Sequence, residues 1–163
     1  MKQNTEYRRQ QTGETLQEAF ARLARQWADA KVPYQHRGMS RQGCDCTGLL
    51  IGIARDLGYL KDYQLRKYPP DWNLHAGAGK QVIEELCRFA EPIDKSQAGP
   101  GDIAIMLFGK CPAHVAVIVD DNGLMVHALK TNGCCTYGHL RNSVWSSRWI
   151  AAYRLKEEKL KND

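Results

Sequence analysis

Apolar residues in the first half of the chain recur at the three- and four-residue spacing of helices. In residues 15–30 they predict an amphipathic helix, which begins with the capping-box pair Thr15 and Glu18. A second helix is predicted between Asp45, whose side chain can cap it, and Gly58, whose backbone freedom suits the position after a helix. Both helices would bury one apolar face.

After residue 102 the periodicity changes to the alternation typical of strands. Before this change the sequence predicts a third helix at about residues 80–90, with Cys87 on its core face. After it, the sequence predicts four strands, at 103–108, 114–120, 124–129 and 149–155. The stretch DDNG, residues 120–123, joins the middle pair as a hairpin. Helices first and an antiparallel sheet afterwards predict an α+β fold.

Length, repeats and charge predict one domain with charged ends. The chain has 163 residues and no internal repeat, and it is long enough to bury its own core. We expect a flexible N-terminal segment over residues 1–14, one domain over 15–155 and a charged, solvated tail over 156–163. The net charge of +5 comes mostly from the ends and lacks interleaved aromatic residues, so no nucleic-acid partner is predicted.

The beginning of the sequence suggests where the protein is made. The first twenty residues contain no apolar segment of a secretory signal, and no apolar run is long enough to span a membrane. We therefore expect synthesis in the cytoplasm, without a membrane span. In that compartment the six cysteines are more often structural, metal-binding or catalytic than bridged.

The stretch GCDCTGLL, residues 43–50, places Cys46 in the first turn of the predicted second helix. Unpaired N–H groups and the helix dipole stabilise a thiolate there, and the same groups can hold an oxyanion. Cys44 lies outside the helix and lacks both advantages. The sequence therefore favours Cys46 as a nucleophile, the alternative being an ordinary buried cysteine.

A cysteine nucleophile needs a base, and HVAVIVDDNGLMVHA, residues 114–128, contains two candidate histidines. With a four-residue loop, His127 faces Ala116 and is the diagonal neighbour of His114, about 7–8 Å away by Cα. With a two-residue loop it faces Ile118, about 13 Å from His114 and too far to orient it. A three-residue loop would turn it to the other face unless a bulge restored it. We predict the four-residue loop.

Three motifs, in this order, resemble those of the NlpC family of cell-wall cysteine peptidases. GCDCTGLL is similar to its nucleophile motif, PGDIAIM to its turn into the sheet, and HVAVIVDDNGLMVHA to its base-bearing hairpin. The resemblance runs from about residue 30 to residue 153 and implies a papain-like fold. It makes Cys46 the nucleophile, His114 the general base and then acid, and His127 the residue that orients His114.

The resemblance also implies further site residues and a substrate. Tyr34 is similar to a tyrosine that helps the oxyanion hole, and Asp45 is an N-cap that can also contact substrate. The implied reaction is hydrolysis of peptidoglycan stem peptides, commonly between D-glutamate and a diamino acid, through an acyl-enzyme and without metal or cofactor. YPPDW, residues 68–72, resembles the phage and gene-transfer-agent tail branch, so phage tail proteins are expected partners and the cell wall the place of action.

A zinc-stabilised binding or structural module is the main alternative. Its candidate ligands are Cys44, Cys46, Cys111, His114, Cys134 and Cys135. The CxC pair is tighter than the usual spacing of structural zinc sites, which disfavours this alternative. Two others are an inactive tail-scaffold protein with the same fold, and a lipid acyltransferase or thioesterase, which requires a longer apolar groove than the sequence indicates.

Overall fold

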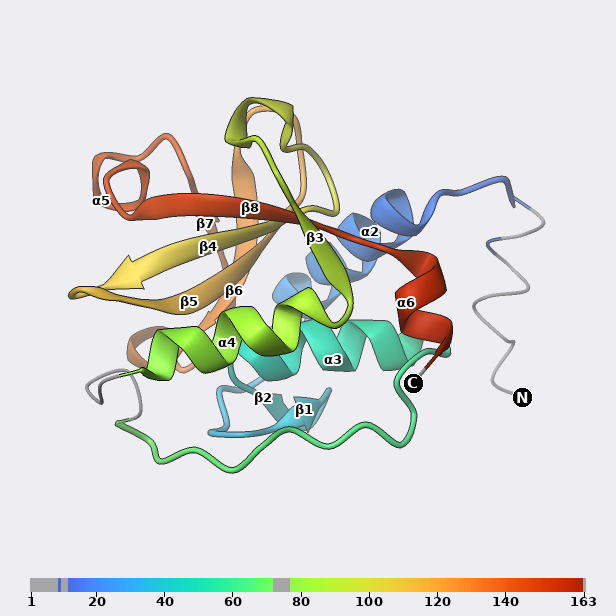
Figure 1. Ribbon diagram of the computed structural model, residues 1–163, viewed down its shortest axis with the longest axis horizontal. Coiled ribbons are helices and arrows are strands. Elements are labelled where there is room, and N and C mark those ends of the chain that lie inside the picture. The colour runs from blue at the N-terminus through green and yellow to red at the C-terminus, as the bar shows by residue number, and fades with distance from the viewer. Residues whose placement is uncertain (1–8, 10–11, 72–76, 163) are drawn as a thin grey trace.

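A computed structural model describes residues 9, 12–71 and 77–162, in which helices pack against one antiparallel sheet (Figure 1). The α+β class predicted from the sequence is confirmed. Trp72, the last residue of the YPPDW stretch, lies outside the described residues.

The longer helices precede the sheet. They are α2 (Leu16–Asp29), α3 (Cys46–Asp56) and α4 (Ala78–Cys87). The capping box of α2 is confirmed, because the Thr15 hydroxyl accepts from the Glu18 N–H at 3.2 Å and the Glu18 carboxylate accepts from the Thr15 N–H at 2.8 Å. Helix α3 is capped by Asp45 and followed by Gly58 at a φ of 95°, also as predicted. Asp45 determines where the helix that carries Cys46 begins, and Gly58 determines where it ends.

The sheet has six strands in the spatial order β3-β8-β4-β5-β6-β7, and every neighbouring pair is antiparallel. The strands are β3 (Ala90–Ile93), β4 (Ile103–Phe108), β5 (Cys111–Ile118), β6 (Leu124–Leu129), β7 (Cys134–His139) and β8 (Trp149–Leu155). The bounds predicted for β4, β6 and β8 are confirmed. Two short strands, β1 (Met39–Ser40) and β2 (Gly43–Cys44), form a hairpin directly before α3.

The loop between β5 and β6 has the predicted four residues. The Val119 N–H donates to the Leu124 carbonyl at 2.9 Å, and the register pairs Val117 with Val126. The carboxylate of Asp120 stabilises the loop, since it accepts from the N–H of Leu124 at 2.8 Å. This register brings the two histidines of the hairpin to the same face of the sheet.

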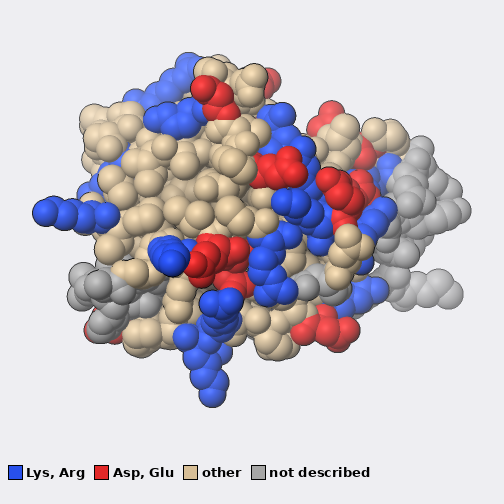
Figure 2. All heavy atoms as spheres, viewed as in Figure 1, with Lys and Arg blue, Asp and Glu red and all other residues tan. Residues whose placement is uncertain are grey.

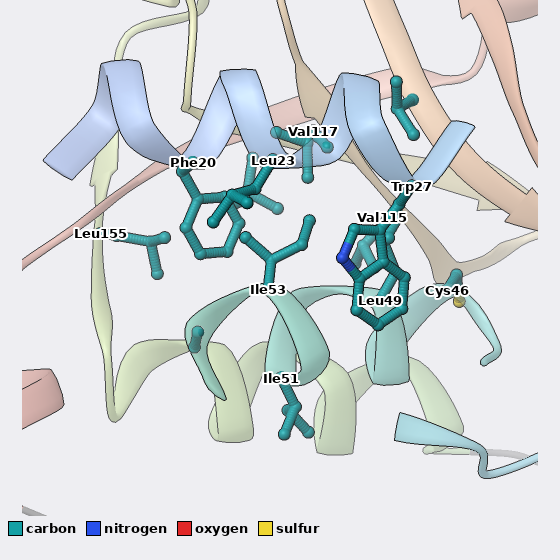
Figure 3. Close-up of a cluster of buried hydrophobic side chains, with 14 of the residues drawn as sticks. Phe20, Leu23, Trp27, Cys46, Leu49, Ile51, Ile53, Val115, Val117 and Leu155 are labelled. Atoms are coloured by element: carbon teal, nitrogen blue, oxygen red, sulfur yellow. The ribbon is translucent and has the colours of Figure 1, made fainter. Parts of the chain in front are cut away.

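One face of the sheet packs against α2 and α3. Figure 3 shows Trp27 of α2 and Ile53 of α3 in the same apolar cluster as Val115 and Val117 of β5. Because side chains alternate along a strand, His114 faces the opposite side, where a second apolar cluster includes the partly buried Trp145 and Trp149. The strand thus separates the main core from the histidine side.

Two predicted elements differ from the observed ones. Strand β5 begins three residues before His114 and includes Pro112, which is tolerated because the pairing with β4 shifts register between Met106 and Leu107. Helix α4 ends at Cys87, and that cysteine is exposed, so its assignment to the core is wrong. Val82 and Leu86 make up the buried side of that helix instead. Strands β1, β2, β3 and β7 were not predicted.

The charged tail also differs from the expectation. Residues beyond β8 fold into α6 (Glu157–Lys161), and Leu160 is buried in the main core, so the tail is not wholly solvated. The buried Arg9 donates to the Tyr59 hydroxyl at 3.1 Å and pairs with Glu157. Buried Leu160 and the contacts of Glu157 with Arg9 and Tyr59 hold this segment against the domain. The remaining short elements are η2 (Lys95–Gln97), η3 (Lys130–Asn132) and α5 (Ser143–Ser146).

One face of the molecule carries charges of both signs. On the face seen in Figure 2, lysine and arginine side chains are interspersed with aspartate and glutamate. Among the helices of the described residues, none has both the length and the apolarity needed to cross a membrane.

Candidate active site

The nucleophile turn is the first turn of α3. Cys46 is the first residue of the helix, and its side chain is 9% exposed. Asp45 caps the helix by accepting from the Gly48 N–H at 2.8 Å and from the Thr47 hydroxyl at 3.1 Å. Only glycine fits at position 48, because a Cβ there would lie 1.7 Å from the carbonyl oxygen of Gly38. The turn is therefore held closely against the preceding loop.

The second carboxylate oxygen of Asp45 binds two further chain segments. It accepts from the Arg37 N–H at 2.8 Å and from the hydroxyl of Tyr68. The Tyr68 hydroxyl also lies 3.0 Å from that of Thr47, and burial followed by the charge of Asp45 raises the pKa of Tyr68. Both oxygens of Asp45 thus organise the turn. A contact of Asp45 with substrate stays a prediction.

The two histidines of the hairpin form a hydrogen-bonded pair. The Nε2 atom of His114 lies 2.9 Å from Nδ1 of His127, and both side chains are almost fully buried, at 2% and 1% exposure. This bond leaves Nδ1 of His114 as the ring nitrogen that can exchange a proton with a nucleophile. His127 is positioned to hold the orientation of the His114 ring.

Aromatic rings enclose the histidine pair. The Trp145 ring stacks on His114 with centroids 5.8 Å apart and meets His127 edge-on at 4.9 Å. Phe108 lies against His114 at 4.9 Å. No pattern in the sequence indicates Trp145, because the short helix α5 lacks a periodic pattern. Strand alternation, by contrast, could have placed Phe108 beside the hairpin.

Cys46 and His114 open into the same cleft. This space, here called the cysteine cleft, has a volume of about 420 Å³. The other side chains that shape it include Tyr34, Pro70, Phe108, Lys130, Trp145 and Arg148. The backbone N–H of Val115, the residue after His114, contacts the Cys46 sulfur. The structure therefore brings together the predicted nucleophile and base from α3 and β5.

Burial governs the protonation of this site. It raises the pKa of Cys46 to about 12, with a further contribution from Asp45, while the N–H groups of Val115, Thr47 and Cys46 itself lower it in part. Desolvation therefore opposes the resting thiolate that the helix terminus favours. Burial, then the charges of His127 and Arg148, lower the pKa of His114. Both shifts favour an uncharged thiol and a neutral imidazole at rest.

The buried histidines predict a pH-dependent stability. Burial lowers the pKa of His127 from 6.5 to about 4, so between these values the unfolded chain binds more protons than the folded one. The free energy of unfolding should then fall by about 1.6 kcal/mol from pH 6.5 to pH 5 through His127 alone. Urea unfolding at these two values measures the fall, and His127→Gln should reduce it. The prediction would be contradicted if the free energy of unfolding changed equally with pH in the two proteins.

Tyr34 lines the cysteine cleft and is half-buried. Its backbone N–H donates to the Gly133 carbonyl at 2.8 Å, and the Cys135 N–H donates to the Val32 carbonyl at 2.8 Å, so residues 32–34 run along the start of β7. Burial, then the charge of Asp45, raises the pKa of Tyr34 to about 12. Its hydroxyl is therefore protonated at neutral pH, as an oxyanion donor must be.

The candidate zinc ligands do not converge. Cys44 lies in the core, where its sulfur is 3.3 Å from that of Cys135, whereas Cys46 opens into the cleft. The contact with Cys135, followed by burial, raises the pKa of Cys44. Within the described part of the chain, no three His, Cys, Asp or Glu side chains form a group that could hold a metal ion.

A thiol at the start of a helix that shares a cleft with a histidine pair on an antiparallel sheet is the arrangement expected of a cysteine peptidase. The match to known proteins agrees: residues 31–154 match the NlpC/P60 family. The chain belongs to this family.

Individual relatives support the same assignment. The chain is 30% identical over 125 residues to the "Probable endopeptidase NlpC" of Escherichia coli (strain K12), covering 76% of this chain and 70% of that protein. Its fold is similar to an NlpC/P60 family protein from Bacillus cereus, with a TM-score of 0.61 at 20% identity over 85% of this chain and 40% of that one. The NlpC/p60 domain of the peptidoglycan hydrolase SagA gives a TM-score of 0.58 at 19% identity over 85% of this chain and 98% of that domain. The chain thus spans less than half of the Bacillus protein.

Proposed function

We propose that the protein hydrolyses peptide bonds in peptidoglycan stem peptides through a Cys-His-His mechanism. The observation that carries the proposal is the shared cleft of Cys46 and His114, with His127 hydrogen-bonded behind His114. The names of its relatives, an endopeptidase and a peptidoglycan hydrolase, support this class of substrate.

In the first step, His114 acts as the general base. Its neutral imidazole takes the proton from the Cys46 thiol as the sulfur attacks the substrate carbonyl. The thiol and imidazole are both uncharged at rest, so the charge forms only during attack, when backbone N–H groups of the α3 turn and the Tyr34 hydroxyl stabilise the oxyanion. The imidazolium of His114 then protonates the leaving amine, which gives a thioester on Cys46.

In the second step, water replaces the amine. His114 removes a proton from the water as it attacks the thioester, and the proton passes to the departing sulfur, which restores the thiol and releases the carboxylic acid. Throughout, His127 holds the His114 ring through the 2.9 Å bond. Trp145 and Phe108 limit the motion of the same ring.

The role of His127 can be separated from that of the base. We expect His127→Gln to lower kcat by about 10- to 100-fold and to change KM little, because the base is still present but less well oriented. Steady-state kinetics on a purified muropeptide measure both constants. A rise in KM at unchanged kcat would assign His127 to substrate binding instead.

We propose that the bond cleaved joins D-glutamate to the diamino acid of the stem peptide, as the family motifs imply. Incubation of purified peptidoglycan with the protein, followed by mass spectrometry of the soluble fragments, identifies the bond directly. Fragments that end in D-glutamate are expected. Cleavage at another bond would overturn the specificity, and no cleavage would favour an inactive scaffold with the same fold.

We also propose association with a phage or prophage tail. The support is the resemblance of YPPDW to the tail-associated branch, and Pro70 of this stretch lines the cysteine cleft. Proteomics of purified particles induced from the source cell tests it. The protein should copurify with tail components, and its absence from particles that retain intact tails would contradict the association.

A further inference from the structure

Two cationic side chains face the cysteine cleft beside the reacting groups. Arg148 follows α5, and Lys130 begins η3, so they come from separate parts of the chain. Both line the cleft that holds Cys46 and His114. In the described part of the chain, neither forms an ion pair with an acidic side chain.

Arg148 is held in a defined position. Its guanidinium carbon lies 5.7 Å from the ring centre of Phe108 and 5.7 Å from that of Trp145. Its backbone is also fixed, because its carbonyl accepts from the Leu107 N–H at 2.9 Å and its N–H donates to the Trp145 carbonyl at 3.0 Å. A cation held between two rings needs little reordering to bind an anion.

In the free protein, the positive charge of Arg148 makes His114 a weaker base. This charge acts on His114 and adds to the burial that lowers the pKa of that base. The same charge disfavours the imidazolium that His114 must become during the reaction. A bound anion at Arg148 would neutralise this effect at the moment when the base accepts its proton.

We propose that Arg148, assisted by Lys130, binds a free carboxylate of the substrate next to the scissile bond. This inference rests on the proposed function and narrows its substrate class to anionic stem peptides. In such peptides the D-glutamate joined through its side chain keeps a free α-carboxylate, and a guanidinium binds a carboxylate through charge-assisted hydrogen bonds. Stem peptides in which this group is amidated lack the charge and are expected to be poor substrates.

The test compares two synthetic tetrapeptides that differ only in this group, L-Ala-γ-D-Glu-diaminopimelate-D-Ala and its α-amide. For the unmodified protein, kcat/KM should be about 10- to 100-fold higher for the free carboxylate. Arg148→Gln should reduce this ratio to near one by slowing cleavage of the acidic peptide. Arg141→Gln is the matched control, since Arg141 is exposed on the same segment and does not line the cleft. The Arg141→Gln protein should keep the ratio of kcat/KM between the two peptides that the unmodified protein shows.

Binding separates this inference from the proposed activity. Calorimetry with the Cys46→Ala protein should show tighter binding of the acidic peptide than of its amide, and adding Arg148→Gln should remove the difference. Equal binding of the two peptides, or a preference that survives Arg148→Gln, would overturn the carboxylate site. A binding preference without hydrolysis by the unmodified protein would keep the site and reject the peptidase function.

Discussion

Replacement of Cys46 by alanine is expected to lower kcat/KM for muropeptide hydrolysis by at least about 10⁴-fold. Without the sulfur no thioester can form, and neither His114 nor the oxyanion donors can compensate. The fold should persist, because the lost atom faces the cleft at 9% exposure and leaves the apolar contacts of α3 in place. Chromatographic assay of muropeptide products, with circular dichroism as a check on folding, measures both effects.

Cys44 provides the matched control for this prediction. It is fully buried beside Cys135 and does not line the cleft, so Cys44→Ala should keep kcat close to that of the unmodified protein. It should cost about 1 kcal/mol of stability, as the loss of a small buried group does. Activity that survives Cys46→Ala would reject Cys46 as nucleophile. A comparable loss of activity in Cys44→Ala would assign the reaction to the other thiol.

Replacement of His114 by alanine should lower kcat by about 10³- to 10⁴-fold, because attack then lacks its general base. The low pKa of His114 also predicts that activity in the unmodified protein persists below pH 6.5 and is lost only as this imidazole becomes protonated. Rate measurements between pH 4 and pH 8 test both statements. In His114→Ala the acidic limb of the rate profile should vanish together with most of the rate.

His139, a half-buried histidine of β7, is the control for this second prediction. It lies outside the cysteine cleft and accepts a hydrogen bond from the Arg141 N–H, so His139→Ala should retain near-normal rates. Equal losses in the two variants would indicate a general requirement for histidine in folding. An acidic limb that remains unchanged in His114→Ala would assign the titrating base to another group.

The parts of the site that depend only on residues adjacent in the sequence could be predicted from local patterns. The cap of α3 at Asp45 needs only a short polar side chain before an apolar helix, and the four-residue loop needs only turn residues between two alternating strands. Together these placed Cys46 at a helix start and His114 beside His127. The nucleophile turn and the histidine pair were therefore predictable.

Features that depend on distant packing were not predictable. The pKa of Cys46 is set by how deeply the cleft buries it, which no local pattern reports. Trp145 and Arg148 reach the histidines from the connection between β7 and β8, so only the completed sheet brings them there. Strand β7 was missed because residues 134–139 contain two cysteines and a glycine and lack a clear alternation.

The pairing of residues 32–34 with the start of β7 does more than position Tyr34 in the cysteine cleft. Strand β7 is an outer strand of the sheet, and an open outer strand invites pairing with the backbone of another molecule. The bridge between Pro33 and Cys134, with its two flanking hydrogen bonds, occupies the first part of this strand. The segment that positions Tyr34 thereby also protects the sheet from intermolecular strand addition and aggregation at that place.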